Sequence, residues 1–364
     1  MKNRLLIRTT LLLLSLLMLA ASLYGCQPVT PAAPAQTAPA ATAVPSAAAA
    51  EPAATPEATA SVKDTLPVLK VPAGDWVYIA NQKGWLQEAF KEFGFEIEIV
   101  EGTLGNEVQL FERGDLHFAG RMIYPVLLYK SQGAAVSVVE VSQHPAPDIV
   151  SILVAKDSPI QTFDDLKGKK IASWRAGCPY MVLYELAETR GWVQGTDWEY
   201  INIPSSENKT ALLSGEVDAI SCHQIGDVAA LLTEGLAREV ANTTQDSVYV
   251  QGGGVTVTFA PTEFANQYPE VVKAYVDLQH ETNAWIKANY DEAAGIVESV
   301  TRTPPVITQF WWSRSDDTWT PELSLSKIKE ETNRTIDWLV AHGDIEADKR
   351  PDTEALFAAQ YFEQ

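Results

Sequence analysis

Two short segments of the chain share one pattern, and this repetition constrains the fold more than any single element does. Residues 110–118 and residues 212–219 each contain the end of a helix, a glycine, an acidic residue and an apolar run typical of a strand. Two copies about 100 residues apart favour two related lobes, because a solenoid needs at least about three repeats. The roughly 300 residues after position 62 also exceed what one hydrophobic core usually supports. We therefore expect two lobes.

Short β-rich runs alternate with helical segments in this part of the chain. The alternation is typical of an α/β fold with mainly parallel strands. Two expected helices end just before Gly94 and Gly191, where a left-handed cap favours glycine. Residues 261–364 show apolar residues at helical spacing, and we expect these helices to pack on lobe 1. The expected strands are residues 68–72, 96–101, 116–120, 136–142, 149–155, 170–173, 217–222 and 255–260, and the expected helices are residues 85–93, 106–113, 179–190 and 208–213.

The N-terminus has the layout of an export signal. Three basic residues in the first eight precede an apolar run over residues 11–23. This run is shorter than the roughly 20 apolar residues of a membrane-spanning helix. It ends in Leu-Tyr-Gly-Cys, which resembles a bacterial lipoprotein cleavage box, so residues 1–25 would form the signal peptide and Cys26 would carry the lipid. Tyr24 is larger than the usual residue there, and an uncleaved apolar anchor is the alternative.

Residues 26–62 differ in composition from the rest of the chain. They consist mainly of Ala, Pro, Thr and Ser and lack the apolar content that forms a core, which indicates a disordered tether. Such a tether lets a globular body reach a partner in the same membrane. We assign residues 63–148 to the first part of lobe 1, residues 149–248 to lobe 2, and residues 249–364 to the return to lobe 1 and the C-terminal helices.

The charge of the chain excludes one class of partner. The formal net charge is −20, which repels DNA and RNA. The same field repels small anions at long range, so an anionic ligand needs a strong local site. The sequence contains no H-E-x-x-H motif, phosphate-binding loop or dinucleotide fingerprint. We therefore expect a monomer without nucleic acid, metal or cofactor.

Five segments, taken in order, carry a family resemblance. They are residues 79–85, 112–119, 156–160, 163–172 and 213–219. They resemble the solute receptors of ABC importers for aliphatic sulfonates, taurine and nitrate, a family that includes thiamine-precursor-binding proteins. The most specific is Asp-Leu-Lys-Gly-Lys-Lys after Asp-Ser-Pro-Ile, which looks like the start of the family's second lobe.

The resemblance covers roughly residues 69–362 and implies a type II periplasmic-binding-protein fold. In this fold, two α/β lobes joined by two crossover strands close on a ligand in the cleft. The resemblance also implies an ABC permease and an ATPase as partners. The chain departs from the family's pattern at Arg121, at residues 174–180 and at residues 222–224, so the resemblance does not supply the ligand.

Candidate ligand contacts follow the expected strands, because ligands of open α/β sheets bind beyond the carboxyl ends of the strands. Arg121 and Arg175 each follow a strand, and a guanidinium binds carboxylate or sulfonate oxygens through paired hydrogen bonds. Gly177 leads into a helix whose N-terminus attracts anions. The alternatives are that Arg121 is a rim charge and that Arg175 pairs with a surface acid. The full candidate set is Trp76, Asn106, Arg121, Gln143, Arg175, Gly177, Cys178, Tyr180, His223 and Gln224.

These residues predict a receptor, and not an enzyme, that binds a small organic anion such as an alkanesulfonate or taurine between Arg121 and Arg175. A receptor for a thiamine pyrimidine is the first alternative, and a ligand-sensing subunit is another. A desulfinase-like enzyme would use Cys178 or Cys222 beside His223 as a Cys/His pair. Export permits a disulfide between the two cysteines, but the sequence does not give their separation.

Overall fold

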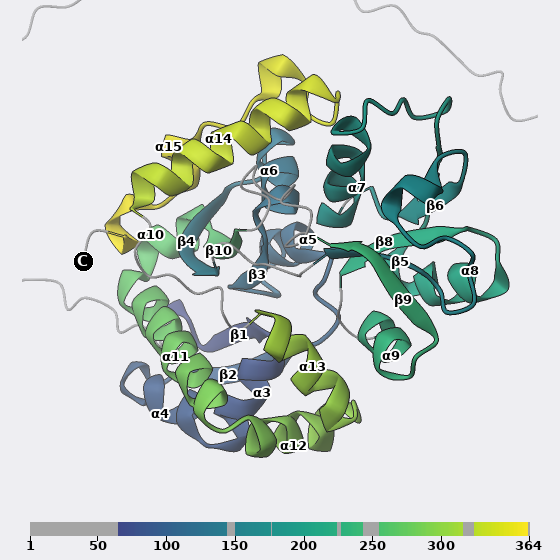
Figure 1. Cartoon of the computed structure of the whole chain (residues 1–364). Helices are drawn as coiled ribbons and strands as arrows, with labels where there is room; N and C mark the ends of the chain where they lie inside the picture. Colours follow the sequence, from purple (N-terminus) through teal and green to yellow (C-terminus); the bar gives the residue numbers. More distant parts are fainter. Residues whose placement is uncertain are drawn as a thin grey trace, which may run out of the picture. The chain divides into compact units, whose positions relative to one another are not determined.

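Three β-sheets organise the described part of the chain (Figure 1). The computed structural model describes residues 65–143, 150–175, 177–223, 227–242, 255–315 and 324–362. We call lobe 1 the part built on two sheets, one of β1 (Val68–Pro72) and β2 (Glu96–Val100), the other of β3 (Ala119–Met122), β10 (Thr256–Pro261) and β4 (Val136–Gln143). We call lobe 2 the part built on β7 (Glu199–Asn202), β6 (Lys170–Ser173), β8 (Ala219–His223), β5 (Val150–Ala155) and β9 (Ala237–Asn242), in that order across the sheet.

The described sheets contain both parallel and antiparallel strand pairs, so the expectation of mainly parallel strands was wrong. β1 pairs with β2, and β6 pairs with β7 and β8, in parallel. The other four of the seven described pairings, which all involve β5 or β10, are antiparallel. The chain leaves lobe 1 through β4 and enters lobe 2 through β5, then returns through β9 and β10. The outward and return strands lie side by side in each lobe and therefore run in opposite directions.

The repeated pattern forms the same unit in both lobes. In lobe 1, α5 (Glu107–Glu112) is followed by Gly114 with a φ of 67°. In lobe 2, α8 (Asn208–Ser214) is followed by Gly215 with a φ of 76°. Both glycines lie in the left-handed region that favours this residue. Each unit ends in a strand, and the predicted repetition is confirmed.

The two units also dock in the same way on a neighbouring strand. The backbone N–H of His117 donates to Lys70 O over 2.9 Å, and Lys70 N–H donates to His117 Nδ1 over 2.9 Å. The backbone N–H of Asp218 donates to Lys170 O over 2.9 Å, and Lys170 N–H donates to Asp218 Oδ2 over 2.9 Å. The repeated unit therefore uses one hydrogen-bonding scheme with two different side-chain acceptors.

Most expected elements are present, with shifted ends. The expected helix at residues 85–93 is α4 (Trp85–Ala89) followed by a 3-10 turn (Lys91–Phe93). The expected strand at residues 116–120 was wrong by about three residues, because residue 117 bonds to the backbone of β1 and β3 pairs with β10 only from Ala119. Arg121 therefore lies inside β3 and does not follow a strand.

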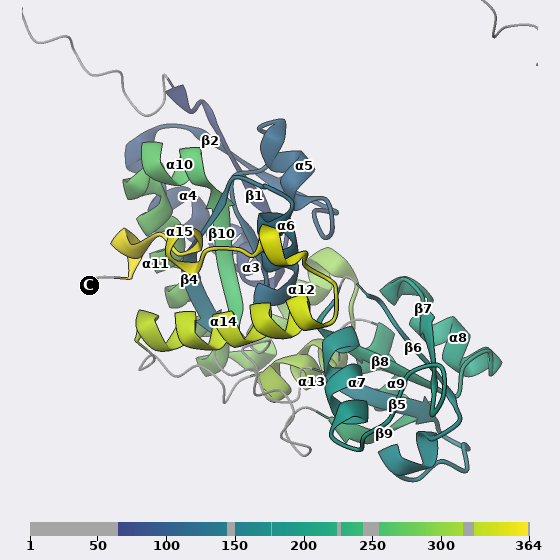
Figure 2. The same ribbon diagram turned by 90° about the horizontal axis from the view of Figure 1, so that it is seen from above.

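Helices cover the sheets of both lobes (Figures 1 and 2). α11 packs against α3 and α4, and α12 packs against α3, so these helices cover lobe 1 as expected. α13 also contacts α9 of lobe 2, and the end of α14 lies beside α7. Among the described helices, none has both the length and the hydropathy needed to cross a membrane. The remaining bounds are α3 (Asp75–Gln82), α6 (Ile123–Ser131), α7 (Cys178–Glu188), α9 (Asp227–Thr233), α10 (Thr262–Gln267), α11 (Pro269–Ala288), α12 (Tyr290–Thr301), α13 (Pro305–Ser315), α14 (Leu325–Ala341) and α15 (Thr353–Leu356).

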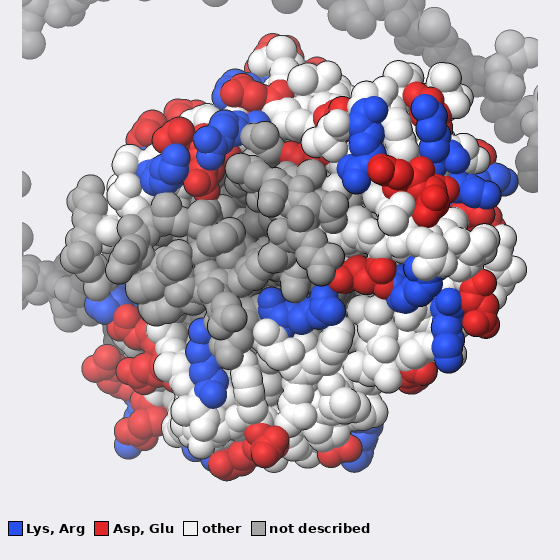
Figure 3. All heavy atoms as spheres, viewed as in Figure 1, with Lys and Arg blue, Asp and Glu red and all other residues white. Residues whose placement is uncertain are grey.

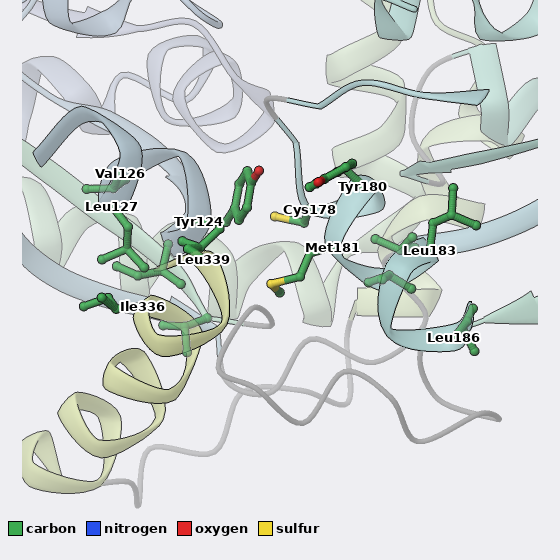
Figure 4. Packing of buried hydrophobic residues seen from close by; sticks show 14 of the residues in the cluster. Tyr124, Val126, Leu127, Cys178, Tyr180, Met181, Leu183, Leu186, Ile336 and Leu339 are labelled. Atoms are coloured by element: carbon green, nitrogen blue, oxygen red, sulfur yellow. The ribbon is translucent and has the colours of Figure 1, made fainter. Parts of the chain in front are cut away.

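One apolar cluster joins the two lobes on the side of α6, α7 and α14. Figure 4 shows Tyr124 of α6 and Leu339 of α14 facing Cys178 and Met181 of α7. The Tyr124 hydroxyl donates to Arg175 O over 2.8 Å. His342, just after α14, shares a hydrogen bond with Glu188 of α7. The lobes therefore share packed side chains as well as the chain crossings.

Candidate ligand-binding site

A cavity of about 250 Å³ lies in lobe 1, where β1 ends and α3 begins. The Ala73 N–H donates to Val100 O over 2.9 Å, which ties this turn to the end of β2. The cavity is therefore at the carboxyl ends of two parallel strands, where ligands of open α/β sheets bind. Its lining residues are Pro72, Ala73, Gly74, Trp76, Thr103, Leu104, Glu107, Ala119, Gly120, Thr258, Tyr275 and Gln279.

Two aromatic rings form one wall of the cavity. The ring centroids of Trp76 and Tyr275 lie 5.0 Å apart in an edge-to-face arrangement. Tyr275 is buried and stacks on Phe118, which fixes its orientation. Trp76 is half-buried, so it has an accessible face for the apolar body of a ligand. The predicted placement of Trp76 at a ligand site agrees with this geometry.

Polar side chains also line the cavity. The Thr258 hydroxyl donates to Gln279 Oε1 over 2.9 Å, and both residues are buried. Thr103 lies in the loop between β2 and α5, and Asn106 is the N-cap of α5. The α3 helix begins at the cavity, and the first N–H groups of any helix have no intrahelical acceptor. The site thus combines an aromatic wall with hydrogen-bonding groups.

A buried ion pair lies behind the cavity. The Arg121 guanidinium donates to Glu107 Oε1 over 2.6 Å, and the exposed fractions of the two side chains are 8% and 2%. The Tyr129 hydroxyl donates to Glu107 Oε2 over 2.9 Å, and burial raises the pKa of Tyr129 to about 12. Glu107 lines the cavity and its charge is matched by Arg121. The Arg121 guanidinium therefore pairs with Glu107 inside the lobe and is not available to bind an anionic ligand.

Asp75 occupies the first turn of α3 beside the cavity. The Trp312 indole N–H donates to Asp75 Oδ2 over 3.0 Å, so a C-terminal helix reaches the site. Burial raises the pKa of Asp75, and the bond from Trp312 opposes this rise. An acid is thus held near the positive end of α3 in a largely desolvated position.

In lobe 2 the guanidinium of Arg175 is also paired with a carboxylate. Its Nε and Nη2 atoms donate to Asp344 Oδ1 over 3.0 Å and 2.7 Å. The Arg175 side chain is 52% exposed, whereas Asp344 is 6% exposed. The guanidinium also lies over the ring of Tyr180, 5.3 Å from its centroid. This arrangement matches the alternative in which Arg175 pairs with an acid.

The other lobe 2 candidates lie at the start of α7 and the end of β8. Gly177 is the N-cap of α7, and Cys178 and Tyr180 are buried in its first turn. His223 is the last residue of β8. The side chain of Gln143, the last residue of β4, and the whole of Gln224 and Cys26 lie outside the described residues. The structure thus gathers the candidates in two places, one in each lobe.

The two described cysteines, Cys178 and Cys222, do not form a disulfide in this structure. Cys178 and Cys222 are buried, and the thiol of Cys222 donates to Ser151 O over 3.7 Å. Burial, followed by the charge of Glu239, raises the pKa of Cys222. A thiol with a raised pKa is a weak nucleophile. Cys222 and His223 are also neighbours in one strand, so their side chains point to opposite faces of the sheet.

Glu107, Tyr275 and Gln279 line the cavity but were not predicted from the sequence. Each belongs to a helix, and Tyr275 and Gln279 come from the C-terminal part of the chain, far from the first strand. Their spacing in α11 resembles that of core residues. No local signal in the sequence distinguishes such residues from ordinary core positions.

The family assignment rests on the cavity-bearing part of the chain. A family model described as NMT1/THI5 like matches residues 75–293, which include every described lobe 2 strand and most of the cavity wall. The chain belongs to the NMT1/THI5-like family. This NMT1/THI5-like chain is 26% identical over 223 residues to the "Putative aliphatic sulfonates-binding protein" of Bacillus subtilis, which is 61% of this chain and 65% of the relative. It is 28% identical over 147 residues to the "Putative thiamine biosynthesis protein" of Haemophilus influenzae, which is 40% of this chain and 44% of the relative. The chain thus spans less than two thirds of either curated relative.

Solved structures show the fold of this NMT1/THI5-like chain. The periplasmic aliphatic sulphonate binding protein SsuA from Escherichia coli superposes with a TM-score of 0.69 at 19% identity, over 82% of this chain and 100% of that one. SsuA from Xanthomonas axonopodis pv. citri, bound to MOPS, gives 0.66 at 20% identity, over 81% and 98%. The desulfurization enzyme DSZB gives 0.54 at 16% identity, over 80% and 98%. The expected periplasmic-binding-protein fold is confirmed.

Figure 3 shows both basic and acidic side chains on one face of the NMT1/THI5-like chain, separated by uncharged surface. Within the described ranges, no group of three or more His, Cys, Asp or Glu side chains is placed to hold a metal ion. The cavity in lobe 1 is the candidate ligand site.

Proposed function

We propose that this protein is an extracytoplasmic solute receptor that delivers a small organic molecule to an ABC importer. The observation that carries the proposal is the lobe 1 cavity, which lies at the carboxyl ends of parallel strands and combines an aromatic wall with polar groups. The export signal and tether predicted in residues 1–62 fit a receptor held at a membrane through Cys26. A permease and an ATPase are the expected partners.

The ligand class that fits the cavity best is a short organosulfonate with an amino group, such as taurine. The sulfonate would accept hydrogen bonds from the N–H groups at the start of α3, where the helix dipole favours negative charge. Glu107 would accept a hydrogen bond from the ammonium group, and Trp76 would cover the short carbon chain. The relatives named for sulfonate binding support this class.

A thiamine-type aminopyrimidine is the second candidate. The edge-to-face pair of Trp76 and Tyr275 suits a flat ring, and the carboxylate of Glu107 suits N–H donors on that ring. The relative named for thiamine biosynthesis supports this candidate. Both candidates carry an N–H donor for the Glu107 carboxylate, which lines the cavity.

The experiment is a thermal-shift screen with matched compounds. Taurine and ethanesulfonate differ by the amino group, and a thiamine aminopyrimidine differs from both by its ring. A ligand at 100 times its Kd adds about 2.7 kcal/mol of stability. We expect taurine to stabilise the protein more than ethanesulfonate does. Stabilisation by the pyrimidine alone would select the second candidate, and no stabilisation by any of the three would reject both ligand classes.

The buried thiols support a receptor over a desulfinase-like enzyme. Cys178 and Cys222 are inaccessible, and neither lines the lobe 1 cavity. A sensing subunit uses the same fold, and the genomic neighbourhood distinguishes the two roles. Neighbouring permease and ATPase genes are expected for transport, whereas a neighbouring kinase gene would indicate sensing.

A further inference from the structure

Asp75 is the first residue of α3, but its carboxylate bonds to another helix. Its neighbours Gly74 and Trp76 both line the lobe 1 cavity. Gly74 is the N-cap of α3 and has no side chain that could accept from the first N–H groups. An acid in the first turn of a helix is normally attracted to those N–H groups. Asp75 Oδ2 instead accepts a hydrogen bond from the Trp312 indole N–H over 3.0 Å.

The indole that binds Asp75 is fixed in place by packing. Trp312 is buried in α13, and its ring stacks on Tyr290 with the ring centroids 5.7 Å apart. Trp312 and Ile79 of α3 belong to one apolar cluster. The α13 helix itself packs against α12 and α9. The indole N–H therefore has a defined position, and the Asp75 side chain turns toward α13 to reach it.

The Asp75 carboxylate is a potential competitor of an anionic ligand. Burial raises the pKa of Asp75, and a desolvated carboxylate needs a hydrogen-bond donor. The N–H groups at the start of its own helix are such donors, and a sulfonate in the cavity would use the same groups. The bond to Trp312 satisfies the carboxylate from the side of α13, so the start of α3 stays available.

We propose that Trp312 is a positioning residue that holds the Asp75 carboxylate away from the N–H groups of α3 and so keeps them available to the sulfonate of a ligand. This inference rests on the proposed receptor function. Trp312 is not among the residues that line the cavity, and it acts through Asp75. The affinity for a sulfonate therefore depends on α13 as well as on the elements that line the cavity.

The test is a double-mutant cycle in which calorimetry measures the affinity for taurine. Trp312→Phe keeps a buried ring but has no N–H donor, and we expect it to weaken binding about 10-fold. In an Asp75→Ala background, which has no competing carboxylate, we expect Trp312→Phe to weaken binding less than about twofold. Equal weakening in both backgrounds would assign Trp312 to packing alone and overturn the proposal. No weakening in the wild-type background would also overturn it.

Trp338→Phe is the matched control for this cycle. The Trp338 indole N–H also donates to a carboxylate, Glu188 Oε2, over 3.4 Å, and neither residue lines the cavity. The same atoms are therefore removed from the same kind of hydrogen bond. We expect Trp338→Phe to leave the affinity for taurine within about twofold of the wild-type value.

A second measurement needs no ligand. NMR follows the amide protons of Trp76 and Val77, in the first turn of α3, between about pH 4 and 8. In Trp312→Phe we expect them to shift with the ionisation of Asp75 at least about twice as far as in the wild type, because the carboxylate then bonds to this turn. Equal shifts in the two proteins would overturn the proposal. If taurine and ethanesulfonate do not bind the wild type, the proposed sulfonate ligand is wrong, and the amide shifts alone decide whether Trp312 positions Asp75.

Discussion

The two lobes contain the same strand and helix unit, yet they use arginine differently near the edge of the sheet. In lobe 1, Arg121 lies inside β3 with its side chain 8% exposed and paired with the buried Glu107. In lobe 2, Arg175 follows β6 with its side chain 52% exposed and paired with Asp344. Arg121 lies one residue before the end of β3, and Arg175 lies two residues after the end of β6. A difference of three residues relative to the strand end thus separates an internal, structural charge from an exposed charge at the junction of the lobes.

Removal of the lobe 1 carboxylate is expected to have the largest effect. Glu107→Gln leaves the buried Arg121 without a neutralising charge, and breaking a buried ion pair from one side costs about 3–5 kcal/mol. Urea unfolding measures this loss. The double variant Glu107→Leu with Arg121→Met removes both charges and is expected to recover most of it. A loss below about 1 kcal/mol for Glu107→Gln would contradict the buried pair.

Lobe 2 contains a buried acid, Glu185, whose ionisation lowers the stability of the protein as the pH rises. Burial, and then the charge of Glu188, raises the pKa of Glu185 to about 8. Glu185 Oε2 has no hydrogen-bond partner in the described part of the chain. Because the folded pKa exceeds the unfolded value of about 4.5, stability is lost as pH rises from about 4.5 to 8.

Glu185→Gln is therefore expected to stabilise the protein increasingly over that window, by at most about 3 kcal/mol at pH 7. Chemical unfolding at pH 5, 6, 7 and 8 measures the trend. Glu216→Gln, which changes an exposed acid elsewhere in lobe 2, is the control. Equal stability differences at all four pH values would show that Glu185 titrates normally.

Lobe 1 carries a histidine with the opposite pH dependence. His117 accepts a hydrogen bond from Lys70 N–H, and burial together with the charge of Lys70 lowers its pKa to about 4. The folded pKa is below the unfolded value of about 6.5, so the unfolded chain binds more protons between these values. Stability is therefore lost as pH falls from about 6.5 to 4.

His117→Gln keeps a hydrogen-bond acceptor but does not titrate. We expect its free energy of unfolding to fall by up to about 2–3 kcal/mol less than that of the wild type over this pH range. Unfolding midpoints between pH 4 and 7 measure the slope. Asp218→Asn changes the corresponding acceptor of lobe 2. We expect this variant to lose stability over the same pH range as the wild type, because His117 is still present. An unchanged slope in His117→Gln would assign the acid sensitivity to other groups.

The ion pair between Arg175 of lobe 2 and Asp344 of the C-terminal segment is expected to give the smallest effect. The Asp344 side chain is only 6% exposed, but the Arg175 side chain is 52% exposed, so water can solvate the carboxylate in Arg175→Ala and we expect a loss of about 1 kcal/mol. Because the guanidinium is engaged by Asp344, we also expect the affinity for taurine to change less than about threefold. Calorimetry measures both quantities. An affinity loss above about 10-fold would restore the role that the sequence predicted for Arg175.

Local elements of the fold were predictable from the sequence, but the neighbours of the site residues were not. Gly94 and Gly191 end their elements with positive φ, as expected from glycine after an amphipathic run. Trp76 was proposed as a ligand contact because it comes shortly after the first strand, and its side chain lines the cavity. The antiparallel strands and the register of β3 were missed, because strand pairing joins residues that are more than 100 positions apart, as for Val257 and Arg121.

By itself, the sequence determined two lobes, the α/β alternation, the glycine-capped helix ends and the family. Each of these depends on residues that are close together in the chain, where backbone preference and apolar spacing act. Only the tertiary structure decided that Arg121 pairs with Glu107 and that Arg175 pairs with Asp344. The charge partners and contacts of a side chain depend on which distant segments are buried against it, and no local pattern in the chain encodes that burial.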